Sequence, residues 1–271
     1  MTVSSHDELT EALGRARAGS SKRVRELLQS SPRRAHVLLR AGIRRHLLTD
    51  RDAFAEENLV MSLMMTRNSI RSALQMLGSE GLIQRRQKVG TRVVAAISEL
   101  PLLEMLPVGT WRSSTGGVDH PSLGVELEHV ERTTVLADGY LRARLELDDF
   151  RVVLQEDLVR RGGEVIGIIV GYHRPGAPDP RGDLETQLSE LRAMSESHIE
   201  ATVEAVNCDE RTAKVLGVEP GSALLVRETL VRDATGRPRM LAYGHYRGDR
   251  VALWARDDSV RAMHQVVDES H

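Results

Sequence analysis

Residues 66–94 read TRNSIRSALQMLGSEGLIQRRQKVGTRVV, and this stretch decides the fold of the first third of the chain. Thr66 stands where its hydroxyl can accept a hydrogen bond from a free amide of a first helical turn, so we expect a helix to begin there. Two short strands at 82–86 and 91–94 then flank the turn 87–90, which predicts a β-hairpin after the helix. The helix buries an apolar stripe at i, i+3, i+4 and i+7 spacing, formed by Ile70, Ala73, Leu74 and Leu77.

Two further helices precede this stretch. Residues 33–48 repeat apolar side chains at three- and four-residue steps, and residues 56–63 carry a shorter stripe. Three helices followed by a hairpin predict a winged helix-turn-helix domain over 33–95, in which the hairpin is the wing. Residues 1–32 are expected to be an N-terminal helical extension, either a frayed basic tail or a helix that packs on this domain.

The third helix also presents a polar face. An arginine can pair with guanine, and an asparagine with adenine, through two parallel hydrogen bonds in the major groove of DNA. A face that only meets solvent is the alternative, but the order of helices and wing, together with the clustered charge, favours DNA. The residues of this face are Arg67, Asn68, Arg71 and Gln75, and the wing adds Arg85, Arg86, Lys88 and Arg92, which can neutralise phosphates.

Charge is divided unevenly along the chain. Residues 1–95 hold 17 lysines and arginines against 9 aspartates and glutamates, while the remainder holds 20 against 30. A basic first third indicates that this end meets a polyanion. The sequence has no run of 18 apolar residues and no apolar core near Met1, so neither a membrane span nor a secretory signal is predicted. The single cysteine, Cys208, cannot form an internal disulfide, and a cytoplasmic location is expected.

The residues of the first third resemble the signature of the GntR family of bacterial regulators over about 33–94. The resemblance runs through Thr66 to Arg71, Glu80 to Ile83, Arg85 to Gln87 and Gly90-Thr91. It implies that the third helix enters the major groove and that the tip of the wing enters the minor groove. The DNA-binding positions that it implies are Thr66, Arg67, Asn68, Ser69, Arg71, Gln75, Gln87, Lys88 and Gly90.

Two positions depart from the family pattern. Glu57 stands in the second helix where the family usually has an arginine, and Lys88 replaces a glycine of the wing. A carboxylate that faces phosphate is repulsive, so Glu57 puts that contact in doubt and indicates an altered operator. Lys88 restores part of the lost positive charge.

The pattern changes after residue 95. Residues 96–117 contain prolines and a Ser/Thr/Gly-rich stretch and are expected to be a linker. The domain expected over 118–260 contains two apolar, β-branched hairpins at 152–172 and 223–246, which repeat at an offset of 73 residues. A short helix precedes each hairpin. Helices that alternate with hairpins predict an α+β fold with a mixed antiparallel sheet, a pseudo-twofold relation and a central pocket.

The last part of the chain resembles the UTRA effector domain, which marks the HutC subfamily of GntR regulators and has the chorismate-lyase fold. The resemblance is carried by Leu216 to Gly221, Leu224-Leu225, Arg237-Pro238 and Tyr246 to Arg250. It is strong from about 205 to 255. It implies a homodimer whose hold on its operator changes when a small-molecule effector binds.

The residues that bind a sugar phosphate in that subfamily are mostly replaced. Two arginines, a serine, a glutamate and a tyrosine correspond here to Asp157, Val159, Asp183, Met240 and Tyr246, of which only the tyrosine is kept. Two acids in a poorly solvated pocket would repel a phosphate, so the effector is predicted to be neutral, cationic or apolar and not a phosphosugar. The alternative is that Asp157 and Asp183 simply face solvent.

The sequence predicts no cofactor, no metal and no enzymatic activity. Its histidines are scattered, and it lacks both a nucleophile motif and a glycine-rich phosphate loop. The predicted function is a sequence-specific DNA-binding transcription repressor, a homodimer that binds a palindromic double-stranded operator under the control of an effector. The alternative is a ligand-binding or lyase-like enzyme whose winged helix mediates protein contacts.

Overall fold

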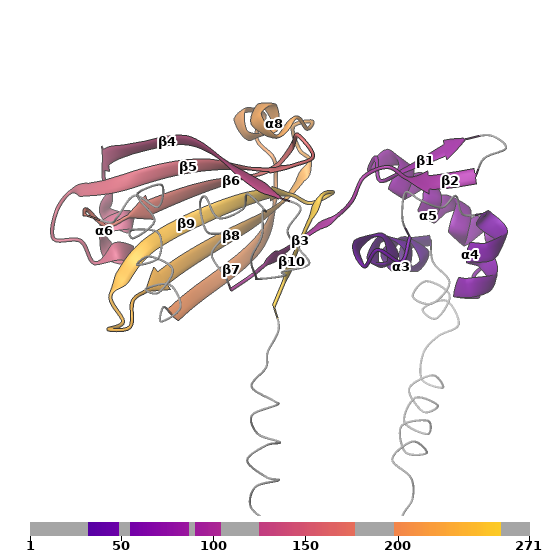
Figure 1. Cartoon of the computed structure of the whole chain (residues 1–271), viewed down its shortest axis with the longest axis horizontal. Helices are drawn as coiled ribbons and strands as arrows, with labels where there is room; N and C mark the ends of the chain where they lie inside the picture. The colour runs from indigo at the N-terminus through magenta and orange to yellow at the C-terminus, as the bar shows by residue number, and fades with distance from the viewer. Residues whose placement is uncertain (1–31, 49–54, 87–89, 104–124, 177–197, 256–271) are drawn as a thin grey trace, which may run out of the picture. The chain divides into compact units, whose positions relative to one another are not determined.

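The computed structural model describes residues 32–48, 55–86, 90–103, 125–176 and 198–255 (Figure 1). The chain divides into two compact units, Met1–Ala96 and Ile97–His271. Three predicted site residues, Gln87, Lys88 and Asp183, lie outside the described residues, as does all but the last residue of the expected extension 1–32.

The first unit contains three helices and a two-stranded antiparallel hairpin. Its elements are α3 (Pro32–Arg44), α4 (Glu56–Leu63), α5 (Arg67–Ser79), β1 (Ile83–Arg86) and β2 (Gly90–Val93). The second helix has the predicted bounds, whereas the first ends four residues earlier than residue 48. His46 has a φ of 56°, a left-handed conformation that ends a helix, and Leu47 N donates to the Gly42 carbonyl in the closing turn.

The start of α5 follows the prediction from sequence. Thr66 has extended backbone angles, and its Oγ1 accepts a hydrogen bond from Ser69 N at 3.2 Å. This satisfies one of the free amides of the first turn. The predicted stripe of α5 is buried and packs with side chains of α3 and of the chain before β1, among them Leu39, Ile43 and Leu82.

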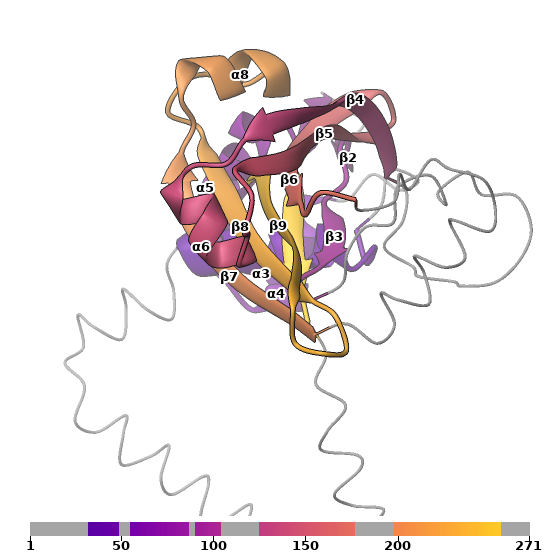
Figure 2. The ribbon, with the colours of Figure 1, turned by 90° about the vertical axis from the view of Figure 1, so that its left-hand side faces the viewer.

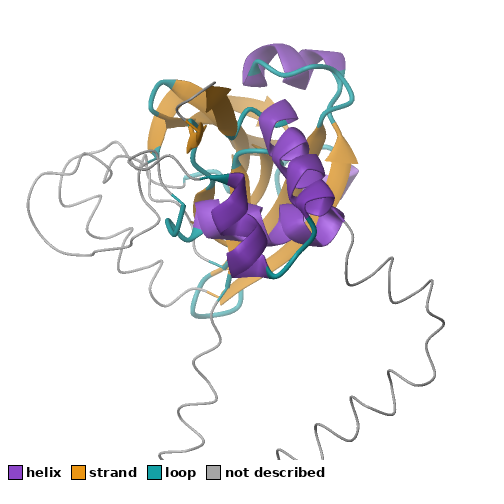
Figure 3. Ribbon diagram, turned by 90° about the vertical axis from the view of Figure 1, so that its right-hand side faces the viewer, coloured by secondary structure: helices purple, strands orange, loops and turns teal. Residues whose placement is uncertain are grey.

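The second unit is built on one six-stranded antiparallel sheet, which gives the chain the predicted α+β character. The strand order is β4-β5-β6-β9-β8-β7. The strands are β4 (Glu126–Leu136), β5 (Arg151–Arg161), β6 (Glu164–His173), β7 (His198–Asn207), β8 (Ala223–Arg232) and β9 (Pro238–Arg247). Figure 3 contrasts these strands with the helices of the first unit by colour.

The order of the elements repeats. Each half of the sheet has a strand, a helix and a hairpin, first β4, α6 (Gly139–Leu145), β5 and β6, then β7, α8 (Glu210–Leu216), β8 and β9. The two halves meet where β6 pairs with β9, so the sheet is symmetric about that seam. Asp138 and Asp209 cap the N-termini of the two helices in the same way, by accepting hydrogen bonds from backbone amides. The predicted duplication is therefore visible in the topology.

Helices cover one face of the sheet. The apolar side of α6 packs with Val152, Leu230 and Leu241, while α8 packs with Leu224 and a few neighbours. Figure 2 shows α6 and α8 on the same side of the strands, with β3 on the other side. The two helices therefore lie on one face of the sheet, and other parts of the chain contact the opposite face.

A short parallel pair of strands lies against that opposite face. Ser98–Pro101 form β3, which pairs with β10 (Val251–Trp254). Leu100 of β3 is fully buried in a cluster that includes Ile169 and Tyr246 of the large sheet. Part of the expected linker 96–117 is therefore a strand of the second unit, because its apolar residues find a partner strand far along the sequence.

Candidate DNA-binding surface and effector site

The predicted polar face of α5 is exposed. Arg67, Asn68, Arg71 and Gln75 are all classed as exposed, with about half of each of the two arginine side chains open to solvent. Ser69, also a predicted DNA-binding residue, is instead 5% exposed, and its Oγ lies 2.9 Å from Thr66 Oγ1. Thr66 and Ser69 therefore build the start of the helix, while the other four side chains point outward.

Two glutamates of α4 meet the arginines of this surface. Glu56 Oε1 accepts a hydrogen bond from Arg71 Nε at 2.8 Å, and Glu56 Oε2 accepts one from Arg85 Nη2 at 2.8 Å. Glu57 Oε1 lies 3.3 Å from Arg67 Nη2. The Glu56 side chain is only 8% exposed, whereas that of Glu57 is 65% exposed. Glu56 thus joins the recognition helix to the base of the wing, and Glu57 holds Arg67 at the surface.

This carboxylate bridge was missed in the sequence. Arg71 and Arg85 come from different elements, so only the packing of α4, α5 and β1 reveals that one carboxylate serves both. Glu57 was singled out for its unusual position, and the neighbouring Glu56 carried no separate signal. Of the predicted wing residues, Gly90 opens β2 with a φ of 105°, a conformation that favours glycine.

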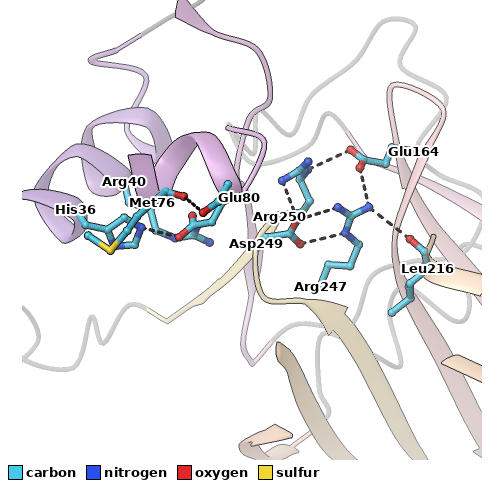
Figure 4. A network of polar contacts seen from close by, with 10 residues as sticks. His36, Arg40, Met76, Glu80, Glu164, Leu216, Arg247, Asp249 and Arg250 are labelled. Carbon is cyan, nitrogen blue, oxygen red and sulfur yellow. Dashed lines mark hydrogen bonds and ion pairs between the residues drawn. The ribbon is translucent and has the colours of Figure 1, made fainter. Parts of the chain in front are cut away.

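A second polar cluster ties α3 to the end of α5. Glu80 Oε1 lies 2.6 Å from His36 Nε2, and Glu80 Oε2 accepts a hydrogen bond from Arg40 (Figure 4). These side chains are partly buried. They fix the first and third helices to each other, so the surface of α5 rests on a defined scaffold.

The face of the large sheet opposite α6 and α8 carries the predicted effector residues that the structure describes. Since side chains alternate along a strand, paired residues of adjacent strands share a face. The pairing Asp157↔Ile169↔Gly244↔Arg227 defines one row across this face, and Gln155↔Gly171↔Ala242↔Thr229 defines the next. We call this surface the polar face, defined by Gln155, Asp157, Arg227 and Thr229, all of which are buried.

Asp157 is 4% exposed, so the alternative that it faces solvent is wrong for this residue. Its Oδ1 lies 3.0 Å from His129 Nδ1, and its Oδ2 accepts a hydrogen bond from Gln155 Nε2 at 2.8 Å. Arg132 Nη1 in turn donates to Gln155 Oε1 at 2.6 Å. A chain of polar contacts therefore joins β4 to β5 on the polar face, and it satisfies both oxygens of a buried carboxylate.

The other predicted effector residues have different surroundings. Val159 is fully buried in the apolar cluster with Leu100 and Tyr246, so it belongs to the core. Met240 is partly buried and pairs with His173 near the other end of the strands. Tyr246 is fully buried, and its hydroxyl accepts a hydrogen bond from Arg227 Nη2 at 3.1 Å.

Glycines make room for the Tyr246 ring. A Cβ on Gly167 would lie 2.6 Å from Tyr246 Cδ1, and a Cβ on Gly244 would collide with the Tyr246 hydroxyl. The ring therefore lies flat on the backbone of β6 and β9. Burial raises the pKa of Tyr246, although the neighbouring Arg227 acts in the opposite direction. The hydroxyl is a neutral group of the polar face at physiological pH.

Arg227 and Thr229 were missed as candidate residues. Both lie in the predicted strand 223–231, two positions apart, so alternation places them on one face. A charged residue within an apolar strand was the available signal. What could not be foreseen is that this face lies beside Tyr246 and β3, where Arg227 Nη1 donates to the Pro101 carbonyl at 2.6 Å.

A third polar cluster closes the end of β9. Arg247 bonds Glu164 and Asp249, and Arg250 bonds the same two carboxylates (Figure 4). Arg247 Nη1 also approaches the Leu216 carbonyl at the end of α8, at 3.4 Å. This cluster holds together the turn of the first hairpin, the end of α8 and the segment that leads to β10.

Neither a metal centre nor a membrane span is found in the part of the chain that the structure describes. Its His, Cys, Asp and Glu side chains form no group of three or more that could hold a metal ion. No helix within the same residues is long and apolar enough to cross a membrane.

Comparison with protein families identifies both units. Residues 33–93 match the family described as bacterial regulatory proteins, gntR family, and residues 179–252 match the UTRA domain. A search of curated proteins returned no match.

The fold is shared with a solved structure. The crystal structure of PhnF from Mycobacterium smegmatis is 21% identical, covers 81% of this chain and 99% of its own, and superimposes with a TM-score of 0.51. The possible transcriptional regulator YydK from Bacillus subtilis is 14% identical, covers 84% of this chain and 99% of its own, and has a TM-score of 0.44. With a GntR-type DNA-binding domain followed by a UTRA domain, the chain belongs to the GntR family of bacterial transcription regulators and has the domain combination of the HutC subfamily.

Proposed function

We propose that the chain is a cytoplasmic, homodimeric repressor that binds a palindromic operator and whose operator affinity changes when a small molecule binds on the polar face of the sheet. The observation that carries this proposal is the exposed face of α5. Arg67, Asn68 and Arg71 lie on the first turns of a capped helix, and they are open to solvent. Arginine and asparagine are the side chains that read guanine and adenine in the major groove.

The paired arginines fit this function. The pair of Glu57 with Arg67 is exposed and contributes little to stability, and the arginines that bond the buried Glu56 are themselves more than half exposed. Stability alone is therefore a weak reason to keep these five charges together. The same arginines gain more from phosphates and base edges, whose negative charge and acceptors they can reach from one surface. The glutamates then hold the arginines in position until DNA replaces some of these contacts.

Two-fold symmetry sets the expected operator. A dimer that places one recognition helix in each of two successive major grooves needs half-sites about one helical turn apart. A footprint of the full chain on the DNA upstream of its own gene should show two protected half-sites with that spacing. Repression would appear as reduced transcription from this promoter when the protein is added.

Substitution of the recognition helix tests the assignment. Arg67→Ala and Arg71→Ala should each weaken operator binding by roughly 1–3 kcal/mol and relax base preference. Arg211→Ala, an exposed arginine of α8, is the matched control and should bind the operator as the wild type does. Unchanged binding by both recognition-helix variants would refute the role given to α5.

Salt dependence separates this function from protein binding through the winged helix. Neutralised phosphates release counterions, so operator affinity should fall steeply as salt is raised. A protein partner that binds mainly by apolar contacts would give a shallow dependence.

A further inference from the structure

Two side chains of β8 are buried on the polar face with groups that have no hydrogen-bond partner. Arg227 is 2% exposed and Thr229 is 1% exposed. Within the described residues, Arg227 Nε and Thr229 Oγ1 have no hydrogen-bond partner. Since nearly all buried polar atoms in proteins are paired, two unpaired groups on one strand face ask for an explanation. A bound ligand with hydrogen-bond acceptors would pair both groups.

Among the residues that the structure describes, Arg227 also has no negatively charged partner. Its two terminal nitrogens donate to neutral oxygens, namely the Pro101 carbonyl at 2.6 Å and the Tyr246 hydroxyl at 3.1 Å. The buried carboxylate of Asp157 lies three strands away in the same row and is bonded to His129 and Gln155. A buried guanidinium with only neutral partners keeps an uncompensated charge, which is costly. The missing partner is therefore an anion.

The sheet leaves small residues beside Thr229. The residue opposite it on β9 is Ala242, and the next one across, on β6, is Gly171. The row then reaches the amide of Gln155 on β5. A hydroxyl and an amide thus flank two small residues on the face opposite α6 and α8 (Figure 2). His173 and Met240 lie over Gly171, where a Cβ would be 3.1 Å from His173 Nε2.

We propose that Arg227 and Thr229 bind a carboxylate of the effector, an inference that rests on the proposed function. The Arg227 Nε–H and the Thr229 hydroxyl supply two donors, and a carboxylate offers two oxygens to accept from them. One buried arginine balances one negative charge, whereas a phosphate dianion would need a second cation. Of the other cations near this face, Arg132 already donates to Gln155, and Arg239 lies near His173. The effector class is a small organic monocarboxylate.

The same guanidinium holds the strand that follows the DNA-binding unit. Pro101 ends β3, and the second unit begins only a few residues earlier, at Ile97. Arg227 Nη1 donates a hydrogen bond to the Pro101 carbonyl at the end of β3. A carboxylate that draws the guanidinium toward itself would weaken this hydrogen bond. Arg227 therefore connects ligand binding with the segment that leads to the first unit.

The test uses the full chain with simple carboxylates. Acetate, propionate and benzoate are the probes, and the corresponding amides, which have similar shape but no charge, are the matched controls. Thermal unfolding followed with each probe should show stabilisation by carboxylates and none by the amides. Glucosamine 6-phosphate serves as the phosphate probe and should have no effect.

Thr229→Val is the decisive variant, because valine keeps the shape of threonine without the hydroxyl. The ligand-free variant should unfold at a higher temperature than the wild type, since an unpaired buried hydroxyl is lost. It should bind the carboxylate about tenfold more weakly or worse. Arg227→Lys, which keeps the charge but lacks the Nε–H, should also lose carboxylate binding.

Several outcomes would overturn the proposal. These are equal stabilisation by amides and carboxylates, no stabilisation by any carboxylate, stabilisation by the phosphate probe alone, or an unchanged carboxylate response in Thr229→Val. Operator binding without any probe is measured on the same proteins. A wild-type protein that does not bind the operator would refute the proposed function. A wild-type protein that binds the operator but whose unfolding temperature does not change with carboxylates would refute this inference alone.

Discussion

Glu57 is the residue that most distinguishes the DNA-binding surface. Its carboxylate lies 3.3 Å from Arg67 Nη2, and both side chains are more than half exposed. An exposed ion pair of this kind is worth about 1 kcal/mol or less. Contact of Arg67 with DNA, as proposed, requires it to leave this partner, so we expect the pair to lower operator affinity and Glu57 to repel nearby phosphates.

Removing the charge of Glu57 should therefore strengthen DNA binding. Glu57→Gln is expected to raise operator affinity about two- to fivefold, the equivalent of one weak ion pair. Fluorescence anisotropy with an operator duplex measures it. Glu126→Gln, an exposed acid of β4, is the control and should leave the affinity unchanged. Weaker binding by Glu57→Gln would show that the glutamate supports the complex.

His173 links stability to pH at the scale of one side chain. Burial, with the nearby Arg132 and Arg239, lowers the pKa of His173 to about 4. The unfolded chain takes up this proton below about pH 6.5, while the folded chain remains unprotonated until about pH 4. Stability from this group is thus complete above pH 6.5 and falls as the pH decreases toward 4.

The free energy of unfolding of the variant His173→Phe should decrease less than that of the wild type as the pH is lowered. Urea unfolding of wild type and variant between pH 7 and 4.5 is the measurement, and the wild type should lose up to about 3 kcal/mol more than the variant as the histidine titrates. Parallel curves for the two proteins would show that His173 does not titrate in this way.

At the scale of elements, the helix ends are determined by capping side chains and by local backbone conformation. The predicted bounds of α4 agree with the structure, a short helix precedes each hairpin as predicted, and Asp138 and Asp209 cap these two helices. The short helix α4 ends at Leu63, and the C-cap residue Met64 has a φ of 50° and is 91% exposed. A left-handed residue with a side chain is strained, and glycine is the usual solution.

Met64→Gly should stabilise the first unit by about 0.5–1 kcal/mol, because it relieves the left-handed strain and loses no packing. Met61→Gly is a matched control three residues earlier. Met61 is also largely exposed but lies inside α4, where glycine should cost about 1 kcal/mol. Chemical denaturation should show a higher free energy of unfolding for Met64→Gly and a lower one for Met61→Gly. Equal changes in the two variants would contradict the role given to the left-handed conformation of Met64.

Some elements could not be predicted from the sequence. The edge strands β4 and β7 carry mostly exposed or half-buried residues, so their apolar alternation is weak. Strand β3 lies in the expected linker and is a strand only because β10 pairs with it. The hairpins were visible because each has two apolar runs around a turn, whereas the contacts of Asp157 with His129 and of Glu56 with Arg71 depend on register and packing.

At the scale of the whole molecule, β3 is the connection between the units. Ser98 is fully buried, its Oγ accepts a hydrogen bond from Arg161 Nη1 at 2.8 Å, and its amide donates to the Arg250 carbonyl at 2.7 Å. Arg227 holds the other end of the strand. These contacts fix the segment of the second unit that directly follows the first unit in sequence.

Ser98→Ala should therefore reduce coupling without removing either binding activity. Operator affinity without effector, and effector affinity without DNA, are expected to stay close to wild type. The factor by which the effector changes operator affinity should shrink, since coupling is a free energy between two sites. Titrations of operator with and without effector measure that factor, and an unchanged factor would exclude Ser98 from the coupling.

The repeated halves of the sheet also bear on how the chain folds. Each half is a three-stranded meander whose strands follow one another in sequence, so its contacts close short loops. Contacts between residues close in sequence form early, because they cost little loop-closure entropy. The β6–β9 seam and the β3–β10 pair join distant segments and should form last. The strand next to the DNA-binding unit is then set in place only after two independently nucleated halves have joined, and the regulatory connection is the final step of assembly.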